Sequence, residues 1–268
     1  LSSQYQTGLL FAYSAANATG VSIIVNNLNS KPYVDLTLET LEAFNLKMPV
    51  NHGYEKFYFN DQPINHSTSQ PFSFTIEGDW SNAAFLLVAA AITGNISVSG
   101  LNMSSVQGDK AIIDVLQQAG AKFEVKGDTI RIAESDLHGF EFDATDCPDL
   151  FPPLVALAAN CKTVSKIRGV HRLLHKESNR AISLQKEFQK MNVPISIEHD
   201  AMLVETVDEL SATEVFSHND HRIAMACAVA GLKANGKIKI QEAEAVNKSY
   251  PNFWNDLQKL GAGVSLVE

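Results

Sequence analysis

The chain has 268 residues, enough for one large or two ordinary domains, and its 45% hydrophobic and 19% charged residues are typical of a globular protein. Its formal net charge of −9 argues against nucleic acid as the main partner but leaves room for a small anionic ligand at a local cluster of cations. No apolar run reaches the roughly 18 residues of a membrane-spanning helix, and the three cysteines, Cys147, Cys161 and Cys227, lack metal-ligand spacing and favour a reducing compartment.

Four segments of the chain share one pattern: a polar opening, an Ala- and Leu-rich run typical of a helix, a Gly or Asn stop, and a short strand rich in Val and Ile. In chain order these segments are residues 2–24, 78–100, 148–169 and 219–241. Their helix openings at Gln4, Asp79, Asp149 and Asp220 follow one another at steps of 75, 70 and 71 residues. A spacing this regular indicates an internal repeat.

A second pattern follows each of these segments: a polar turn, an amphipathic helix and two short alternating strands such as AKFEV and DTIRI. The amphipathic helices are predicted over residues 34–45, 110–120, 182–192 and 252–261. Each ends in Gly or Asn, the residues that most easily adopt the left-handed conformation after a helix. The sequence therefore predicts an α/β fold built from a repeat of about 70 residues, strand–helix–strand–helix–strand–strand, present nearly four times.

A strand is also expected before the first helix of three copies. These leading strands are PFSFTIEG (71–78), GFEFDATD (139–146) and LSATEVFS (210–217). The first copy has no such strand, so we expect an N-terminally truncated chain. The polar stretch NDQPINHSTSQP, residues 60–71, is predicted to be a loop or hinge. We therefore expect a partial domain over residues 1–76 and a domain of three repeats over residues 77–268.

The polar residues that open the helices are candidates for binding, because equivalent loops of a stacked repeat lie on one face. Helix N-termini favour anions through their free N–H groups and partial positive charge. Lys176, Arg180, Arg222 and Lys248 add cations at such openings, where they oppose the helix dipole. Together they predict a convergent site for phosphate or carboxylate.

Simpler interpretations of these residues stay open. The stretch HKESNR, residues 175–180, is also consistent with a solvated helix face carrying one ion pair. For Ser2, Asp79 and Asp149 the simpler interpretation is an N-cap of the helix, which we expect for Asp79 and leave open for Asp149. A third interpretation is a metal cluster of His218, Asp220 and His221, which we do not expect beside Arg222.

Several of these stretches resemble motifs of the 5-enolpyruvylshikimate-3-phosphate (EPSP) synthase family. HKESNR is similar to the family's K-E-[ST]-D-R, NDHRIAMA to N-D-H-R-[IM]-A-M, and NKSYPNFW to K-[ST]-[FY]-P-x-[FY]. SSQYQTGLL, SKPYVDLT and CPDLFP match its S-S-Q, S-K-P-Y and P-D stretches. The matches occur in order along essentially the whole chain. The resemblance implies an enolpyruvyl transferase-like fold of two domains with three repeats each, of which about four repeats are present here. Asn179 departs from it, because the family usually has Asp there.

The resemblance implies an enzyme of the shikimate pathway, which leads to chorismate and the aromatic amino acids. It would transfer the enolpyruvyl (carboxyvinyl) group of phosphoenolpyruvate to the 5-hydroxyl of shikimate 3-phosphate and release phosphate. The resemblance implies small-molecule substrates, no cofactor and no metal. We also expect a cytoplasmic monomer without nucleic-acid or membrane partners.

Roles for single residues follow from the same resemblance, position by position. Asp149 would take the proton of the 5-hydroxyl, Glu177 would protonate the methylene carbon of phosphoenolpyruvate, and Lys176 would act between the substrates as a charge and proton partner. The residues expected to bind shikimate 3-phosphate are Ser2, Ser3, Gln4, Ser30, Tyr33, Asp149 and Lys176. Those expected to bind phosphoenolpyruvate are Gln4, Arg180, Arg222 and Lys248.

Two alternatives remain for the function. One is the sister enzyme UDP-N-acetylglucosamine enolpyruvyl transferase, whose fold is similar but which the KESNR and SKPY stretches fit less well. The other is a non-catalytic module that only binds anions. Because the resemblance implies further substrate-binding residues in an N-terminal part absent from the sequence, we expect the chain to be inactive alone.

Overall fold

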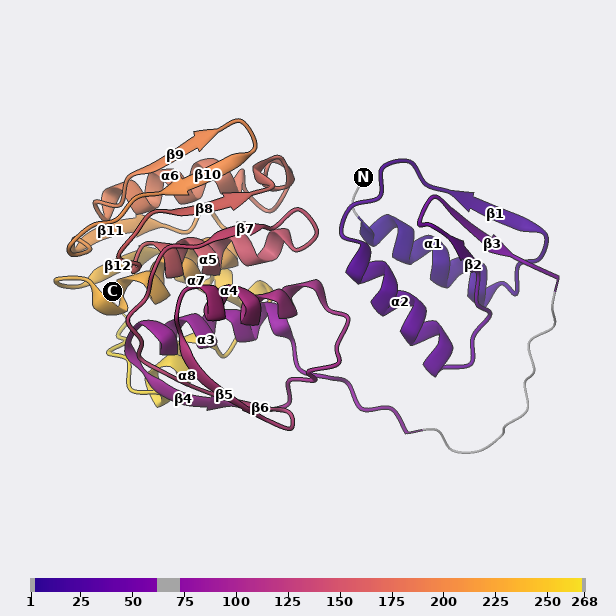
Figure 1. Ribbon diagram of the computed structural model, residues 1–268, viewed down its shortest axis with the longest axis horizontal. Coiled ribbons are helices and arrows are strands. Elements are labelled where there is room, and N and C mark those ends of the chain that lie inside the picture. The colour runs from indigo at the N-terminus through magenta and orange to yellow at the C-terminus, as the bar shows by residue number, and fades with distance from the viewer. Residues whose placement is uncertain (1–2, 62–72, 267–268) are drawn as a thin grey trace. The chain divides into compact units, whose positions relative to one another are not determined.

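The computed structural model of the protein describes residues 3–61 and 73–266. It divides into two compact units, shown in Figure 1. Unit 1 comprises Leu1–Glu77 and Ser104–Gly108, and unit 2 comprises Gly78–Met103 and Asp109–Glu268.

Unit 1 is one layer of two helices on a small sheet (Figure 1). Its elements are α1 (Ser3–Ala15), β1 (Val21–Ile24), α2 (Lys31–Ala43), β2 (Val50–His52) and β3 (Lys56–Phe59). The antiparallel strands have the order β1–β3–β2. Leu10 of α1, Val34 and Leu41 of α2, and Phe57 and Phe59 of β3 are buried together and form the core of the unit.

Unit 2 contains three copies of the predicted repeat, of which only the middle one has all its strands among the described residues. Its helices are α3 (Trp80–Thr93), α4 (Ile112–Gln118), α5 (Phe151–Ala158), α6 (Arg180–Lys190), α7 (His221–Ala230) and α8 (Phe253–Lys259). Its strands are β4 (Asn95–Val98), β5 (Lys122–Lys126), β6 (Thr129–Ala133), β7 (Glu141–Asp143), β8 (Ser165–Arg168), β9 (Ile195–Glu198), β10 (Ala201–Val204), β11 (Thr213–Phe216) and β12 (Ile238–Gln241). They form the sheets β4–β6–β5, β7–β8–β10–β9 and β11–β12. None of the described helices is long and apolar enough to cross a membrane.

The core of unit 2 is built on the first helix of each copy. Helices α3, α5 and α7 contact one another, and nearly every residue of each is buried. A helix that is apolar around its whole circumference must be enclosed by other elements, which explains the Ala- and Leu-rich composition of all three. The N-termini of α5 and α7 lie side by side, and Arg222 Nη1 donates to the carbonyl of Asp149 at 3.4 Å. The polar residues before these two helices therefore meet at one end of the core.

The second helices of all four copies end in the same way. The residue two positions after each helix is left-handed: Asn45 (φ 50°), Gly120 (φ 82°), Asn192 (φ 67°) and Gly261 (φ 102°). The N–H of the following residue donates to a carbonyl five residues back, in the pairs Leu46–Leu41, Ala121–Leu116, Val193–Phe188 and Ala262–Leu257, at 2.8–3.0 Å. This is the Schellman arrangement, which satisfies carbonyls that the helix leaves open. The predicted left-handed helix ends are confirmed, and they mark the repeat more clearly than any other feature.

The strands that were expected to lead the copies differ from one another. Those in 139–146 and 210–217 are confirmed as β7 and β11, which pair in parallel with β8 and β12. The one expected over 71–78 is wrong for its described residues: residues 73–77 form no strand, and Ile76 is 84% exposed. A strand needs a neighbouring ladder for its N–H and C=O groups, and no described strand pairs with this segment. Likewise, the closing strands expected after α8 are absent from residues 262–266.

The close approach of two chain segments before β7 yields a stability prediction. A Cβ atom added at Gly139 would lie 2.1 Å from the carbonyl oxygen of Val164, so the main chain would have to move. We expect Gly139→Ala to lower the free energy of unfolding by about 2 kcal/mol. The control is Gly263→Ala, where no atom lies within 4 Å of the added Cβ. Urea unfolding followed by circular dichroism measures both variants, and equal stabilities would contradict the prediction.

Candidate active site

The centre of the site is the guanidinium group of Arg180, the first residue of α6, which is only 1% exposed. Its Nη1 donates to Asp149 Oδ1 at 2.7 Å and its Nε to Asp220 Oδ2 at 2.8 Å, while Nη2 donates to Glu177. One buried cation therefore binds three carboxylates, which come from the start of α5, the loop before α6 and the start of α7. Since a buried charge is stable only when it is paired, these contacts hold the three segments together.

Asp149 is the carboxylate with the most cationic partners. Besides Arg180, it receives Lys176 Nζ at 3.1 Å, and Arg222 Nη2 lies 3.4 Å from its Oδ2. Burial alone would raise the pKa of Asp149, but the charges of Arg222, Lys176 and Arg180 outweigh it and hold that pKa well below its usual value. In this state Asp149 is ionised at neutral pH and accepts a proton poorly. It does not cap a helix, because its side chain is bound to these cations.

Asp220 was expected only as a polar residue at a helix opening, and the structure shows it to be a partner of Arg180. It is fully buried, caps α7 by accepting from the N–H of Arg222 at 3.0 Å, and also accepts from Ser178 Oγ at 3.0 Å. Burial would raise its pKa, but the charge and hydrogen bonds of Arg180 outweigh it and lower that pKa. Its place in NDHR, next to Arg222, was the one feature of the sequence from which this role could have been inferred.

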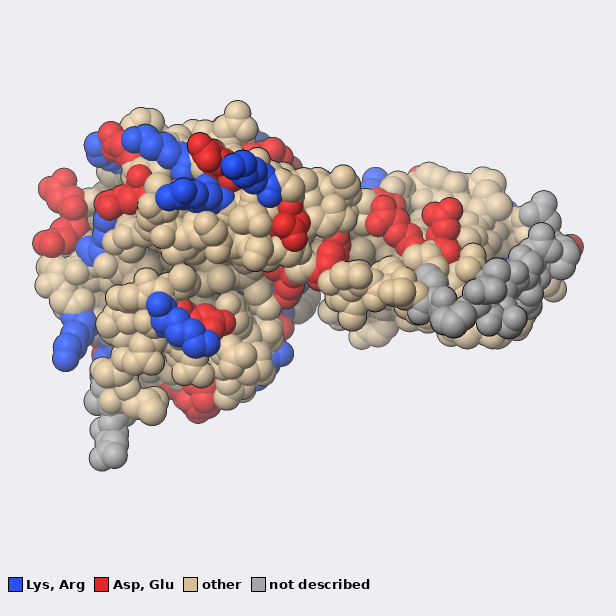
Figure 2. Space-filling view, turned by 90° about the horizontal axis from the view of Figure 1, so that it is seen from below, with Lys and Arg blue, Asp and Glu red and all other residues tan. Residues whose placement is uncertain are grey.

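Three cations are placed around the opening of α7. Arg222 is in the first turn of the helix, Lys176 lies against Asp149, and Lys248 Nζ donates to the carbonyl of Asn219 at 2.5 Å. Lys176 is partly exposed and Lys248 is exposed, so their ammonium groups can reach a bound anion. On the face shown in Figure 2, acidic and basic side chains of unit 2 are intermixed and form no broad basic surface.

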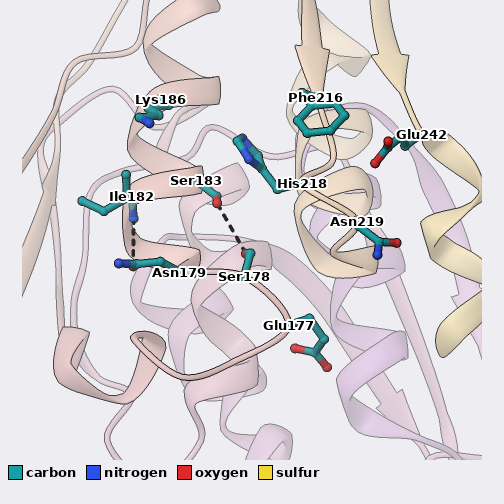
Figure 3. Close-up of a pocket in the computed structure, with 10 residues that line it drawn as sticks. All are labelled: Glu177, Ser178, Asn179, Ile182, Ser183, Lys186, Phe216, His218, Asn219 and Glu242. Atoms are coloured by element: carbon teal, nitrogen blue, oxygen red, sulfur yellow. Dashed lines mark hydrogen bonds between the residues drawn. The ribbon is translucent and has the colours of Figure 1, made fainter.

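Glu177 differs from the other two carboxylates in its exposure. Its side chain is 40% exposed and stands at one end of a pocket of about 470 Å³ (Figure 3). Its neighbour Asn179 caps α6, with the side-chain oxygen accepting from the N–H of Ile182 at 3.4 Å. Asn serves here as a good N-cap, as Asp would. The departure from the family's usual Asp therefore leaves the helix opening intact.

The residues expected to bind shikimate 3-phosphate are divided between the units. In unit 1 the structure places Ser3, Gln4, Ser30 and Tyr33, while Ser2 lies outside the described residues. Ser3 begins α1, and Ser30 precedes α2 in a left-handed conformation. The two helices lie side by side, with Thr7 Oγ1 2.7 Å from Thr37 Oγ1. Asp149 and Lys176 belong to unit 2.

The described residues do not form the metal cluster that His218, Asp220 and His221 could have made. Within residues 3–61 and 73–266, no three His, Cys, Asp or Glu side chains are arranged to hold a metal ion. Asp220 is bound to Arg180 instead, and His218 Nε2 lies 2.8 Å from Glu187.

Comparison with known proteins identifies related sequences. A family described as EPSP synthase (3-phosphoshikimate 1-carboxyvinyltransferase) matches residues 1–257. The proteins named 3-phosphoshikimate 1-carboxyvinyltransferase from Clostridium novyi and Clostridium acetobutylicum are each 38% identical to the chain, over 97% and 98% of it and 59% and 60% of their own length. The chain thus spans about three fifths of the length of these relatives.

Solved structures share the fold. An EPSP synthase from Acinetobacter baumannii superimposes with a TM-score of 0.82 at 24% identity, covering 100% of this chain and 62% of the other. The enolpyruvyl transferase NikO from Streptomyces tendae gives a TM-score of 0.67 at 17% identity, over 93% of this chain and 59% of the other. These likenesses confirm the α/β fold predicted from the repeats.

The buried pair of Arg180 and Asp220 leads to a prediction for stability and its pH dependence. We expect Asp220→Asn to lower the free energy of unfolding by about 3 kcal/mol at neutral pH, because it removes one charge of a buried ion pair. Since the pKa of Asp220 is lower when folded, this stabilisation is complete above the unfolded pKa of about 3.9 and is lost as pH falls through the folded pKa.

Urea unfolding at a series of pH values checks this. The difference in free energy of unfolding between the wild type and Asp220→Asn should be constant above about pH 5 and shrink below about pH 4. Asp136→Asn, in the exposed pair with Lys162, is the matched control and should change stability little. A difference that persists unchanged in acid would contradict the account.

Proposed function

The chain belongs to the EPSP synthase family, and we propose that its protein transfers the enolpyruvyl group of phosphoenolpyruvate to the 5-hydroxyl of shikimate 3-phosphate, releasing phosphate. The observation that carries the proposal is the pairing of Lys176 and Arg222 with Asp149, with Lys248 at the opening of α7 and the more exposed Glu177 on Arg180. Such a set offers cations for the substrates' anionic groups and separate carboxylates for acid and base chemistry. The proposal places the protein in aromatic amino acid biosynthesis as a cytoplasmic monomer, with domains at residues 1–76 and 77–268.

Phosphoenolpyruvate would bind to the cations around α7. Lys176, Arg222 and Lys248 can surround its phosphate and carboxylate, and the N–H groups at the opening of α7 add partial positive charge. Arg180 stays part of this set in the proposal. Its nitrogens donate to Asp149, Glu177 and Asp220, so it would also hold these carboxylates in place.

Shikimate 3-phosphate would bind to the residues that the sequence predicts for it. Ser3, Gln4, Ser30 and Tyr33 supply hydroxyl and amide groups of the kind that bind phosphate and alcohol oxygens. Asp149 would accept the proton of the 5-hydroxyl, with Lys176 beside it. The proposal also keeps Ser2 as a residue that binds shikimate 3-phosphate and Gln4 as one that contacts phosphoenolpyruvate.

The low pKa of Asp149 fits its proposed role as a base once the substrates are bound. Its pKa is low because three cations surround it. Two anionic substrates would draw these cations to their own oxygens, and the pKa of Asp149 would rise toward that of a useful base. Binding of the substrates would then itself raise the pKa of Asp149 and so activate Asp149 as the base.

Glu177 would be the acid in the addition step. As Asp149 removes the hydroxyl proton, the oxygen would bond to C2 of phosphoenolpyruvate, and Glu177 would add a proton to its methylene carbon. In the second step, the bond from C2 to the phosphate oxygen would break and phosphate would leave with the proton held by Asp149. The new methyl group would return a proton to Glu177, restoring the double bond. The hydroxyl proton would thus be accepted by Asp149 at the start of α5, and the proton on carbon would come from Glu177 in the loop before α6.

The test of the proposed function is phosphate release from phosphoenolpyruvate with shikimate 3-phosphate. We would assay the chain alone and joined to the part of the Clostridium novyi relative that it does not cover, since the chain spans 59% of that relative. We expect release by the joined protein only when both substrates are present. Release only with UDP-N-acetylglucosamine as the acceptor would contradict the proposal in favour of the sister enzyme. No release with either acceptor would contradict it in favour of a binding module.

The role of Glu177 can be tested in the same joined protein. We expect Glu177→Gln to lower kcat by about 100-fold or more, because the amide cannot donate the proton to carbon. The matched control is the neighbouring change Asn179→Asp, which keeps a good cap on α6 and should leave kcat nearly unchanged. Normal turnover by Glu177→Gln would exclude the acid role.

A further inference from the structure

Glu187 is a buried carboxylate that the proposed mechanism does not use. It lies in the second turn of α6 and is 2% exposed. Its Oε2 accepts from Lys190 Nζ at 2.6 Å and from the N–H of Phe216 at 2.9 Å, and its Oε1 lies 2.8 Å from His218 Nε2. Burial alone would raise the pKa of Glu187, but these partners outweigh it and hold that pKa below its ordinary value. An ionised group thus fastens the segment after β11 to α6.

The segment that Glu187 fastens has an unfavourable backbone. His218 and Asn219 are both left-handed, with φ of 55° and 53°. Two consecutive non-glycine residues in this region cost free energy and persist only where other contacts fix them. Within the segment, the N–H of Asn219 donates to Ser217 Oγ at 3.1 Å and that of Asp220 to the carbonyl of Ser217 at 3.0 Å. Figure 3 shows the His218 ring extending from this segment toward α6.

The same segment sets the position of two groups in the candidate site. The carbonyl of Asn219 receives Lys248 Nζ at 2.5 Å. The carboxylate of Asp220, the next residue, receives Arg180 Nε at 2.8 Å. A change in the backbone at His218 would therefore move the acceptor of Lys248 and the partner of Arg180 together.

We propose that Glu187 is a positioning residue, which through His218 fixes His218 and Asn219 in their left-handed conformation and so sets where Lys248 meets an anionic substrate. The inference rests on the proposed function, since phosphoenolpyruvate is the substrate that Lys248 would bind. Glu187 itself touches no substrate in this account.

The variant that tests the link is His218→Asn. Asn adopts the left-handed conformation readily but is too short to reach Glu187, so the change removes the link without adding backbone strain. The matched control is His199→Asn, at another left-handed histidine (φ 54°), exposed in the turn between β9 and β10. Glu187→Gln, which keeps a hydrogen-bond acceptor for Phe216, serves as the conservative variant and Glu187→Leu as the severe one.

Two measurements separate positioning from a merely structural role. The first is hydrogen exchange of residues 216–222 in the 268-residue chain, which needs no ligand. The second is the dissociation constant of phosphoenolpyruvate, measured by calorimetry with shikimate 3-phosphate in the joined protein. We expect His218→Asn to speed exchange in this segment about 10-fold and to weaken phosphoenolpyruvate binding about 10-fold. His199→Asn should change neither, and Glu187→Gln should keep more affinity than Glu187→Leu.

The outcomes are distinguishable. Unchanged exchange in His218→Asn would overturn the inference, and so would faster exchange with unchanged affinity, because the segment would then not position Lys248. A joined wild-type protein that neither binds phosphoenolpyruvate nor releases phosphate would overturn the proposed function and the substrate part of the inference. In that case the exchange data alone would still decide whether His218 and Glu187 hold the segment.

Discussion

The interaction on which the candidate site depends is the burial of the Arg180 guanidinium among the carboxylates of Asp149, Glu177 and Asp220. Burying one cation is unfavourable unless carboxylates surround it, and burying the carboxylates is unfavourable without the cation. Because the three acids come from three different segments, the ion cluster ties the openings of α5, α6 and α7 to one another. The positions of the remaining cations follow, since Lys176 and Arg222 bind to the same Asp149.

This cluster also explains how an acidic protein can present an anion site at helix openings. Lys176 and Arg222 lie where the helix dipole disfavours positive charge. The carboxylate of Asp149 offsets that cost and keeps both cations in place before any substrate arrives, while Asp220 caps α7 by accepting from the N–H of Arg222. In the proposed reaction, bound anions would give Lys176 and Arg222 new partners, and the pKa of Asp149 would rise with the occupancy of the site. A strongly ionised carboxylate could then act as the base.

Much of the fold could be predicted because its determinants are local. The Gly or Asn after each amphipathic helix, such as Gly120 and Asn192, fixed the helix ends, and the Ala- and Leu-rich runs indicated enclosed helices. The strand expected before α3 failed because a strand depends on a partner elsewhere in the chain, and Ile76 has no neighbouring strand in the described part of the protein. Most candidate residues of the site could be predicted for the same reason, because each lies in a short sequence motif.

What could not be predicted were contacts between distant residues. Arg180 binds Asp220 across 40 positions of sequence, and a sequence motif does not show that its guanidinium faces protein carboxylates and not solvent. Glu187 lies in the run LQKEFQK, which has the composition of a solvent-facing helix, and it is buried only because the segment after β11 packs on it. Both cases concern charged residues whose burial depends on the tertiary structure.

A double-mutant cycle between Arg180 and Asp220 tests the central claim most directly. Urea unfolding would give the free energies of the wild type, Arg180→Met, Asp220→Asn and the double variant. If the buried ion cluster organises the site, the two changes should be non-additive, with a coupling free energy of about 2 kcal/mol or more. Additivity within about 0.5 kcal/mol would contradict the account, because Arg180 and Asp220 would then stabilise the protein independently.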